Sequence, residues 1–407
     1  MEVFAMHLPT QTDIAIIGAG PQALTLAAHL LQKRSQMQEK MVVLDPSGFW
    51  MHQWQRLFSM LEISHLRSPA AHQPDPNPQA LHQFAKHRTS ELFSPHDLPG
   101  ARLFQDFCQT LVYRWQLQQQ VHRALVRRIT PLKQDRSCLR IGLSGGKSIT
   151  AQRVVLAMGG GMLNFPTWVN KIATPYPQHR LCHSNEVDLR WLRLRGERVL
   201  IVGGGLTSGH LAVGAVARGA QVLLLSRRRL MEKWFDIDPD WLNSSHFQKF
   251  VAERDWEARW EMIQQARNGG SITPEMMARL RQLQQTGQVN LHQRCQVVKA
   301  EWRGDRWQVR CQDGATLECD RIWLATGTKL DATQNPLLAD VLKEFPTGIV
   351  NGLPVLDDHL RWQGCNLFLM GGLAALQVGP TACNLAGARM ASDRIVNALT
   401  KPSLVRC

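Results

Sequence analysis

The stretch DIAIIGAGPQALTLA, residues 13–27, decides the first half of the fold. It begins with a nearly continuous apolar run, which is typical of a parallel strand covered on both faces. A turn that contains Gly18, Gly20 and Ala23 follows, and the residues after this turn have the composition of a helix. The stretch RVLIVGGGLTSGHLA, residues 198–212, has the same form. The chain is therefore expected to contain two strand–turn–helix units.

Each unit continues in the same way. The first leads to the strand MVVLD, which ends at Asp45, and the second leads to AQVLLLS, which ends at Ser226. Each half then has short strands that predict a β-meander, and a last strand that closes in a loop of small residues. In the second half we expect TLECDRIWLATG, residues 316–327, to form that last strand without a break. This internal repeat predicts two similar domains.

The C-terminal stretch, residues 366–399, has the pattern of a strand, a glycine turn and a long helix. We expect it to return and complete the first domain. The predicted fold class is α/β, with two Rossmann-like dinucleotide-binding domains and one inserted in the other. The predicted boundaries are 1–194 and 326–407 for the two parts of the first domain and 195–325 for the inserted domain.

Composition narrows the functional class. The chain has 407 residues, of which 44% are hydrophobic, so it can bury substantial cores. It starts without a basic segment followed by a long apolar run, and it lacks an uninterrupted apolar stretch of roughly 18 residues. We therefore expect a cytoplasmic protein that does not enter a membrane.

Charge and cysteine spacing exclude other classes. The formal charge is +14, but no long basic run occurs, so we expect anionic cofactors and no nucleic acid as partners. The nine cysteines form no CxxC pair, which argues against a zinc ribbon and against a thioredoxin-reductase-type dithiol. No metal is therefore expected.

The first turn predicts a site for FAD. Gly18 allows the tight turn, Gly20 lets the backbone approach a pyrophosphate, and Ala23 permits close packing of helix and strand. The following helix N-terminus favours phosphate groups. Asp45 suits ribose hydroxyls and would repel a 2′-phosphate. The expected cofactor-binding residues of this unit are Gly18, Gly20, Pro21, Gln22, Ala23 and Asp45.

The second turn predicts a site for NADPH. Here the strand ends in Ser226 followed by three arginines, where the first unit has an acid. Arginine forks bind phosphate through two hydrogen bonds, so this end suits the 2′-phosphate. The sequence does not say which arginine reads it. The expected residues are Gly203, Gly205, Thr207, Ser208, Arg227 and Arg228. With two dinucleotides bound, NADPH would donate hydride and FAD would accept it.

These motifs together resemble the class B flavoprotein monooxygenases, above all the lysine/ornithine N-hydroxylase branch, and the related oxidative-stress-induced growth inhibitor proteins. GAGPQA and VGGGLTSG carry the resemblance most strongly. SGFWMHQW is similar to the segment beside the flavin, and LATGT is similar to the loop that links the domains. The resemblance adds Trp50, Thr326, Gly327, Gly371, Gly372 and Gly379 as expected cofactor-binding residues.

The resemblance implies a monooxygenase. In that family, reduced flavin and O₂ form a C4a-hydroperoxyflavin, which oxygenates the nitrogen or sulfur of a small-molecule substrate. The cofactor does this chemistry, so a catalytic triad is not expected. The catalytic residues stay unknown, with His52, His65 and Arg67 as candidates; the last two lie in the irregular segment 63–78, which is a candidate substrate loop.

Two alternatives stay open. Pro177 and His179 stand where the class B fingerprint has an aromatic residue and a glycine, and Thr328 stands where N-hydroxylases usually have tyrosine. These departures favour an NADPH-dependent flavin reductase or oxidase that does not insert oxygen. The third hypothesis is a non-catalytic, redox-sensing flavoprotein. The sequence also leaves open the substrate and whether the chain forms a homo-oligomer.

One helix can be bounded from local signals alone. In GGSITPEMMARLRQLQQTG, Pro274 opens the helix, Ser271 or Thr273 caps it, and Gly287 closes it. Its apolar side chains are expected to pack in a core; these are Met276, Met277, Leu280 and Leu283.

Overall fold

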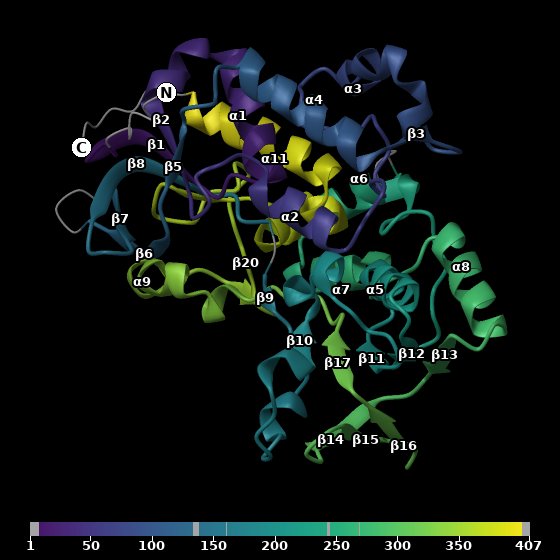
Figure 1. Cartoon of the computed structure of the whole chain (residues 1–407). Coiled ribbons are helices and arrows are strands. Elements are labelled where there is room, and N and C mark those ends of the chain that lie inside the picture. The colour runs from purple at the N-terminus through teal and green to yellow at the C-terminus, as the bar shows by residue number, and fades with distance from the viewer. Residues whose placement is uncertain (1–7, 133–137, 160, 242–244, 268, 401–407) are drawn as a thin grey trace.

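The computed structural model describes residues 8–132, 138–159, 161–241, 245–267 and 269–400. Two sheets with parallel cores organise these residues. Figure 1 shows the first sheet at the upper left, with helices beside it, and the second sheet near the bottom. The predicted α/β class and the two Rossmann-like units are confirmed.

The first sheet has the order β5–β2–β1–β8, and all these neighbours are parallel. The first residues of β8 pair antiparallel with β7 of the meander, and its last residues pair parallel with β21. Because β21 comes from the C-terminal segment, that segment completes the first sheet. The strands are β1 (Gln11–Ile17), β2 (Met41–Asp45), β5 (Val121–Arg123), β6 (Val126–Pro131), β7 (Leu139–Leu143), β8 (Ser148–Leu156) and β21 (Leu367–Leu369).

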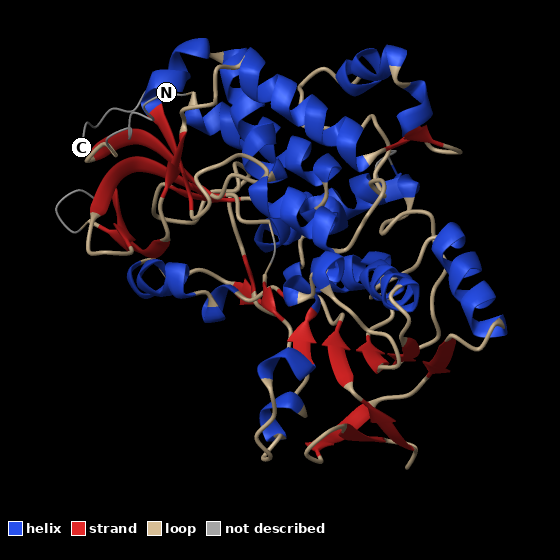
Figure 2. Ribbon diagram, viewed as in Figure 1, coloured by secondary structure: helices blue, strands red, loops and turns tan. Residues whose placement is uncertain are grey.

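Most helices of the first domain, among them α1, α4 and α11, lie together beside its sheet, whereas α9 lies against β6 (Figure 2). Helix α1 packs against α11, and at this contact the His29 Nδ1 and Asp393 Oδ1 atoms lie 3.0 Å apart. Apolar side chains from β1, α1, α4 and α11 form one continuous core, as expected of strands covered on both faces. The helices are α1 (Pro21–Lys33), α2 (His52–Met60), α3 (Ala80–Phe84), α4 (Ala101–Arg114), α9 (Ala339–Glu344), α10 (Ala375–Val378) and α11 (Leu385–Leu399).

The second sheet has the order β10–β17–β11–β12–β13, with every pair parallel. Its strands alternate between two cores: Val199 and Ile201 point to the helix side, and Leu200 points to the meander side. The elements are β10 (Leu181–His183), β11 (Arg198–Val202), β12 (Gln221–Ser226), β13 (Val289–Gln293), β17 (Arg321–Leu324), α5 (Leu206–Ala217) and α8 (Pro274–Gln285).

The expectation of one unbroken strand over residues 316–327 is wrong. The structure has β16 in the antiparallel meander and β17 in the parallel sheet. Asp320 separates them, because its N–H donates to the Arg198 carbonyl at 2.8 Å and its carboxylate accepts from the Arg198 N–H at 2.6 Å. These bonds turn the chain from one sheet into the other. The meander strands are β14 (Val297–Trp302), β15 (Trp307–Cys311) and β16 (Thr316–Cys319).

The predicted boundary at residue 194 does not match the sheet pairing. β10 lies before that residue, yet it pairs with β17 in the second sheet. Conversely, Phe250 and Ile263 lie within the predicted inserted domain, but their side chains belong to the core of the first domain. Phe250 is on α6 (Ser245–Ala252) and Ile263 is on α7 (Trp256–Arg267). The inserted segment therefore reaches back over the first domain.

Two short crossing segments connect the domains. β9 (Met162–Leu163) pairs antiparallel with β18 (Thr328–Lys329), so the outgoing and returning chains form a narrow ribbon. The two remaining hairpins lie in the first domain and complete the described strands: β3 (Leu92–Phe93) with β4 (Leu98–Pro99), and β19 (Ile349–Val350) with β20 (Leu353–Pro354).

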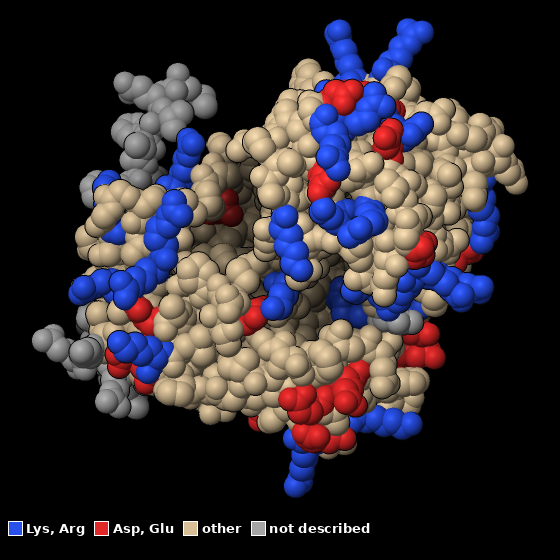
Figure 3. All heavy atoms as spheres, turned by 90° about the horizontal axis from the view of Figure 1, so that it is seen from below, with Lys and Arg blue, Asp and Glu red and all other residues tan. Residues whose placement is uncertain are grey.

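Basic side chains are scattered over the surface in view. Figure 3 shows Lys and Arg side chains spread over the face seen from below, with Asp and Glu between them and hollows in the surface. Among the described residues, no helix combines the length and the apolar character that a membrane crossing demands.

The Phe250 side chain is expected to contribute much of the packing energy that holds α6 against the core of the first domain. Its ring is fully buried and lies under the Arg259 guanidinium, 5.2 Å from the ring centre. Truncation to alanine leaves a cavity, so Phe250→Ala should lower the free energy of unfolding by about 3–5 kcal/mol in urea titrations. Val251→Ala is the control, since Val251 is 47% exposed and should change this free energy by less than about 0.5 kcal/mol. Equal effects of the two variants would contradict the packing role.

Candidate functional site

The first glycine-rich turn leaves open space at the N-terminus of α1. Gly18 has φ +99°, and a Cβ atom there would lie 3.0 Å from the Ala157 carbonyl oxygen, so this position requires glycine. Gly20 is the N-cap of α1, and a Cβ atom built on it would meet nothing within 4 Å. Pro21 occupies the first turn of the helix, and Ala23 is fully buried. An anion can therefore approach the N-terminus of α1 at Gly20.

Asp45 is fixed beside this turn. One carboxylate oxygen accepts the Ala19 N–H at 3.1 Å, and the other accepts the Ser47 N–H at 2.9 Å. The side chain is only partly buried. The Ser47 hydroxyl also donates to Asp45, at 2.5 Å. A carboxylate has about four lone-pair sites, so Asp45 keeps capacity to accept one further hydroxyl group.

Two orphaned acceptors lie where α1 meets the start of α11. The Gln22 Nε2 atom donates to the Ala382 carbonyl at 3.2 Å, whereas Gln22 Oε1 has no partner among the described residues. The Asn384 Oδ1 atom at the N-cap of α11 is also buried without a partner there. Buried polar atoms are normally satisfied, so this pair fits a ligand that brings hydroxyl or N–H donors.

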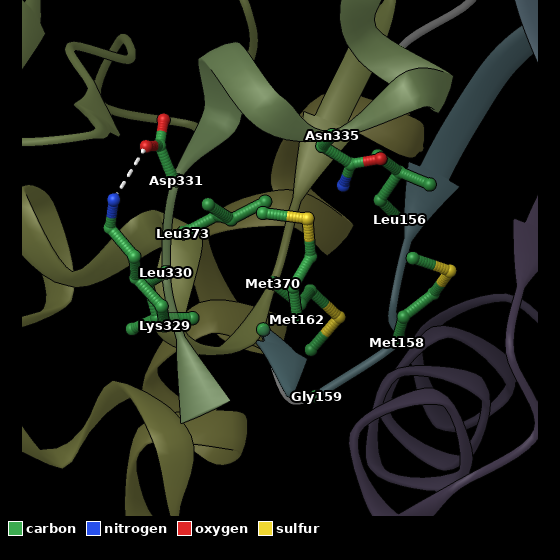
Figure 4. Close-up of a pocket in the computed structure, with 11 residues that line it drawn as sticks. Leu156, Met158, Gly159, Met162, Lys329, Leu330, Asp331, Asn335, Met370 and Leu373 are labelled. Carbon is green, nitrogen blue, oxygen red and sulfur yellow. Dashed lines mark ion pairs between the residues drawn. The ribbon is translucent and has the colours of Figure 1, made fainter. Parts of the chain in front are cut away.

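An apolar cavity of about 130 Å³ opens at the carboxyl ends of β8 and β21. Figure 4 shows the side chains of Met158, Met162 and Met370 among those that line it, with the Lys329–Asp331 ion pair, 3.3 Å long, at one edge. Met158 also adjoins the first turn, because a Cβ on Gly18 would lie 3.4 Å from the Met158 Cα. The sequence interpretation missed these methionines, although it noted the small-residue loop that follows β8.

The three predicted C-terminal glycines have different surroundings. Gly371 lies against Gly159, and its Cβ would be 3.0 Å from the Gly159 carbonyl oxygen. A Cβ on Gly372 would be 2.5 Å from Leu330, and one on Gly379 would be 3.5 Å from the Phe250 ring. Gly371 is therefore tightly packed against backbone, and both Gly371 (φ +72°) and Gly379 (φ +89°) have a backbone conformation that favours glycine. Their contact with a cofactor stays a prediction.

The second turn repeats the geometry of the first. Gly203 has φ +155°, and its N–H donates to the Leu225 carbonyl at 2.9 Å. Gly205 is the N-cap of α5, and the buried Ser208 hydroxyl donates to the Gly205 carbonyl at 2.6 Å. Thr207 lies in the first turn of the helix and is partly buried. The Ser208 hydroxyl therefore stabilises the turn itself.

The end of β12 places arginines where the first domain has Asp45. Ser226 is buried, and the side chains of Arg227, Arg228 and Arg229 that follow are exposed. The Arg228 guanidinium lies against Gly269. This end of the second sheet thus offers cationic groups to a phosphate.

The Trp50 side chain is buried in the core and does not present an exposed ring face to a cofactor. It is 9% exposed, and its indole N–H donates to the Leu117 carbonyl at 2.8 Å. Thr326 and Gly327 lie in the returning connection between the domains. The Asn164 N–H donates to the Gly327 carbonyl at 3.0 Å, and the His183 Nε2 lies 3.1 Å from the same oxygen. For these three residues, cofactor binding stays a prediction.

The catalytic candidates are not brought together. His52 is exposed at the start of α2. The His65 ring stacks on Phe93, with ring centres 4.6 Å apart, and the Ser64 hydroxyl lies 2.8 Å from His65 Nδ1. The Arg67 guanidinium is saturated by bonds to the second domain, so in this structure it joins domains and leaves no N–H group directed to a substrate.

His210 on α5 predicts acid sensitivity. Burial, with a smaller effect of His65, lowers the pKa of His210 from 6.5 to about 4. Between these values the unfolded chain binds a proton that the folded chain does not. The free energy of unfolding should therefore fall as the pH drops below 6.5, with a slope that stays under about 1.4 kcal/mol per pH unit.

His210→Gln should reduce this slope in urea titrations between pH 7.5 and 5. The matched control is His87→Gln, because His87 is exposed. If the His210 variant kept the full slope, another group would be responsible for the acid sensitivity.

The comparisons with known proteins come from one family model and from solved structures. Residues 15–161 match the family model described as FAD-NAD(P)-binding. This segment contains the last residues of β1, the first turn at Gly18 and Gly20, and strands β2 to β8. The sequence has no significant match among curated proteins.

Solved structures of similar fold cover nearly the whole chain. The ornithine hydroxylase of Pseudomonas aeruginosa is 17% identical over 95% of this chain and 98% of its own, with a TM-score of 0.77. The ornithine N-hydroxylase of Kutzneria sp. 744, solved with reduced FAD, NADP⁺ and L-ornithine, is 16% identical over 96% and 99%, with a TM-score of 0.77. The bacillithiol disulfide reductase of Bacillus cereus is 16% identical over 96% and 98%, with a TM-score of 0.60. The chain therefore carries a FAD-NAD(P)-binding domain at residues 15–161 and shares its whole two-sheet fold with ornithine N-hydroxylases.

Proposed function

We propose that this protein binds FAD at the first turn and NADPH at the second, and that it oxygenates a small molecule at nitrogen or sulfur with O₂. The observation that carries this proposal is the pair of glycine-rich turns, each between a parallel strand and a helix N-terminus. The open Gly20 position and the two orphaned acceptors support a bound dinucleotide in the first domain. The fold shared with N-hydroxylases supports the reaction class.

The chain's own residues bind and orient the cofactors. Gly18 and Gly20 leave room for the FAD pyrophosphate at the N-terminus of α1, whose N–H groups donate to it, and Asp45 accepts hydrogen bonds from ribose hydroxyls. Gln22 and Asn384 accept donors from the rest of the molecule. When bound, FAD accepts hydride from NADPH and passes electrons to O₂.

Apolar side chains line the cavity beside the first turn. Met370 is buried, whereas Met158 and Met162 are 45% and 40% exposed, so a bound cofactor or substrate would cover them and complete the exclusion of water. Arg227 and Arg228 bind the 2′-phosphate of NADPH. A soft nucleophile such as an amine or a thioether is the expected substrate class.

Rapid mixing of the purified, FAD-loaded protein tests the proposal. Under anaerobic conditions, NADPH should bleach the flavin absorbance. After mixing with oxygenated buffer, O₂ should be consumed first, and the absorbance of oxidised flavin should return more slowly than O₂ disappears. Such a delay supports oxygenation and justifies a screen of amines and thioethers with ¹⁸O₂. A failure of NADPH to bleach the flavin would overturn the proposed activity and leave a non-catalytic flavoprotein.

The second candidate is an NADPH-dependent reductase or oxidase without oxygen insertion. Pro177 and His179, at positions where the class B fingerprint has an aromatic residue and a glycine, favour it. So does the likeness of fold to a bacillithiol disulfide reductase. In the same experiment this candidate predicts immediate return of the oxidised flavin, with one peroxide released per NADPH.

A further inference from the structure

The two turns differ at equivalent positions. Gly20 is the N-cap of α1, the helix that follows β1, and Gly205 is the N-cap of α5, the helix that follows β11. The second glycine of such a turn is the position at which backbone approaches pyrophosphate. The space beside Gly20 is empty, but a Cβ on Gly205 would lie 3.5 Å from the Gly270 Cα. Part of the chain therefore covers the second turn.

The covering segment is residues 269–271, which we call the glycine loop. A Cβ on Gly270 would lie 2.8 Å from the Gly205 Cα and 3.1 Å from the Gly205 nitrogen. Its neighbour Gly269 lies against the Arg228 guanidinium. The glycine loop thus contacts both the turn expected to bind a pyrophosphate and an arginine expected to bind a 2′-phosphate.

Hydrogen bonds from two directions hold the glycine loop in place. Directly after the loop, the Ile272 N–H donates to the Met231 carbonyl at 2.8 Å, and the Lys233 N–H donates to the Ile272 carbonyl at 2.9 Å. From the first domain, Arg67 donates to the Ser271 hydroxyl at 2.9 Å and to the Ser271 carbonyl at 3.2 Å.

Arg67 is itself firmly placed. Its side chain is 11% exposed, and it also donates to the Lys233 carbonyl at 2.6 Å, the Trp234 carbonyl at 2.9 Å and the Asp236 carboxylate at 2.5 Å. One guanidinium therefore bonds to both segments that flank the second turn. Charge-assisted bonds from a buried fork fix geometry more strongly than neutral ones.

We propose that Arg67 is a positioning residue for the second dinucleotide site, because it holds the glycine loop closed over the turn at Gly205. This inference rests on the proposed binding of NADPH there. A pyrophosphate and Gly270 compete for the space beside Gly205, so the cofactor binds only when the loop is displaced. Arg67 belongs to the first domain. The first domain therefore controls, through this side chain, how readily NADPH binds to the second domain and donates hydride.

Removing the Arg67 guanidinium is expected to strengthen NADP⁺ binding, although the loss of a positioning residue usually weakens binding. The apparent dissociation constant equals the intrinsic one divided by the fraction of open protein, so weakening the closed loop strengthens binding. Arg67→Met removes the guanidinium and keeps a long apolar stem. It should bind NADP⁺ about tenfold more tightly than the native protein. Arg67→Lys, which retains the charge, should lie between the two.

A second variant acts on the loop without touching Arg67. Gly270 is not one of the glycines with left-handed backbone, so alanine is conformationally allowed there. Its Cβ would clash with Gly205 only in the closed position. Gly270→Ala should therefore also bind NADP⁺ more tightly.

The experiment is calorimetric titration of NADP⁺ into the FAD-loaded full-length protein and its variants. Glu62→Gln is the matched control, since Glu62 bonds Arg218 across the same domain interface at 2.7 Å without touching the glycine loop. It should leave the NADP⁺ affinity unchanged. A general loosening of the interface would instead change the affinity in this control as well.

The outcomes separate this inference from the proposed function. Unchanged or weaker NADP⁺ binding by both Arg67→Met and Gly270→Ala, with the native protein binding NADP⁺, overturns the role of Arg67 and the loop alone. If neither the native protein nor any variant binds NADP⁺, the assignment of the second site falls together with the loop.

Discussion

Gly20→Asp is expected to give a folded protein that purifies without flavin. The space beside Gly20 is open, so an aspartate side chain fits there without displacing backbone. Its carboxylate would occupy the place of the pyrophosphate and would repel it at short range. We expect FAD to bind at least about a hundredfold more weakly, which corresponds to a loss of about 2.7 kcal/mol.

The flavin content of purified protein, read from absorbance and from protein concentration, measures this effect. Circular dichroism should show unchanged secondary structure. Gly20→Asn has nearly the same shape without the charge, so it should retain more flavin than the aspartate variant and thereby separate repulsion from steric exclusion. Full flavin loading of Gly20→Asp would show that the pyrophosphate lies elsewhere.

The double replacement of Arg227 and Arg228 by alanine should have the second largest effect. Both side chains are exposed at the end of β12, where the first domain has Asp45. Charge-assisted hydrogen bonds contribute about 1.5–3 kcal/mol each, so the loss of two should weaken NADPH binding by about a hundredfold or more. NADH lacks the 2′-phosphate, and its affinity should change by less than about threefold.

Titrations with both coenzymes measure this selectivity. Arg229→Ala is the matched control, because Arg229 is also exposed on the same run and is expected to leave the ratio of NADPH to NADH affinity nearly unchanged. Equal losses for NADPH and NADH in the double variant would show that these arginines do not bind the 2′-phosphate. Selectivity lost in the control instead would assign that role to Arg229.

Local pattern was sufficient for several elements. The sequence predicts the helix that begins at Pro274 and its end at Gly287, with Ser271 or Thr273 as the cap, and the structure selects Thr273. The Thr273 hydroxyl accepts the Met276 N–H, and Gly287 with φ +72° follows the helix. The buried face of this helix includes Met277, Leu280 and Leu283. Such features depend on residues within one or two helical turns, so a single sequence contains them.

Features that depend on distant residues were not predictable. The strand over residues 316–327 breaks because Asp320 bonds Arg198, more than a hundred positions away. The Arg67 side chain, a catalytic candidate from its place in an irregular segment, is saturated by residues 233–236 and 271. The residues around Asp320 and around Arg67 in the sequence do not indicate either set of distant partners.

By itself, the sequence determined the two strand–turn–helix units, their glycine positions and the contrast between Asp45 and Arg227–Arg229. These features follow from backbone sterics and periodicity, which act between near neighbours. Only the tertiary structure decided that β10 joins the second sheet, that α6 and α7 cover the first domain, and that Gly270 lies over Gly205. Those contacts arise from packing between segments far apart in the chain, where shape and burial, rather than local preference, select the partner.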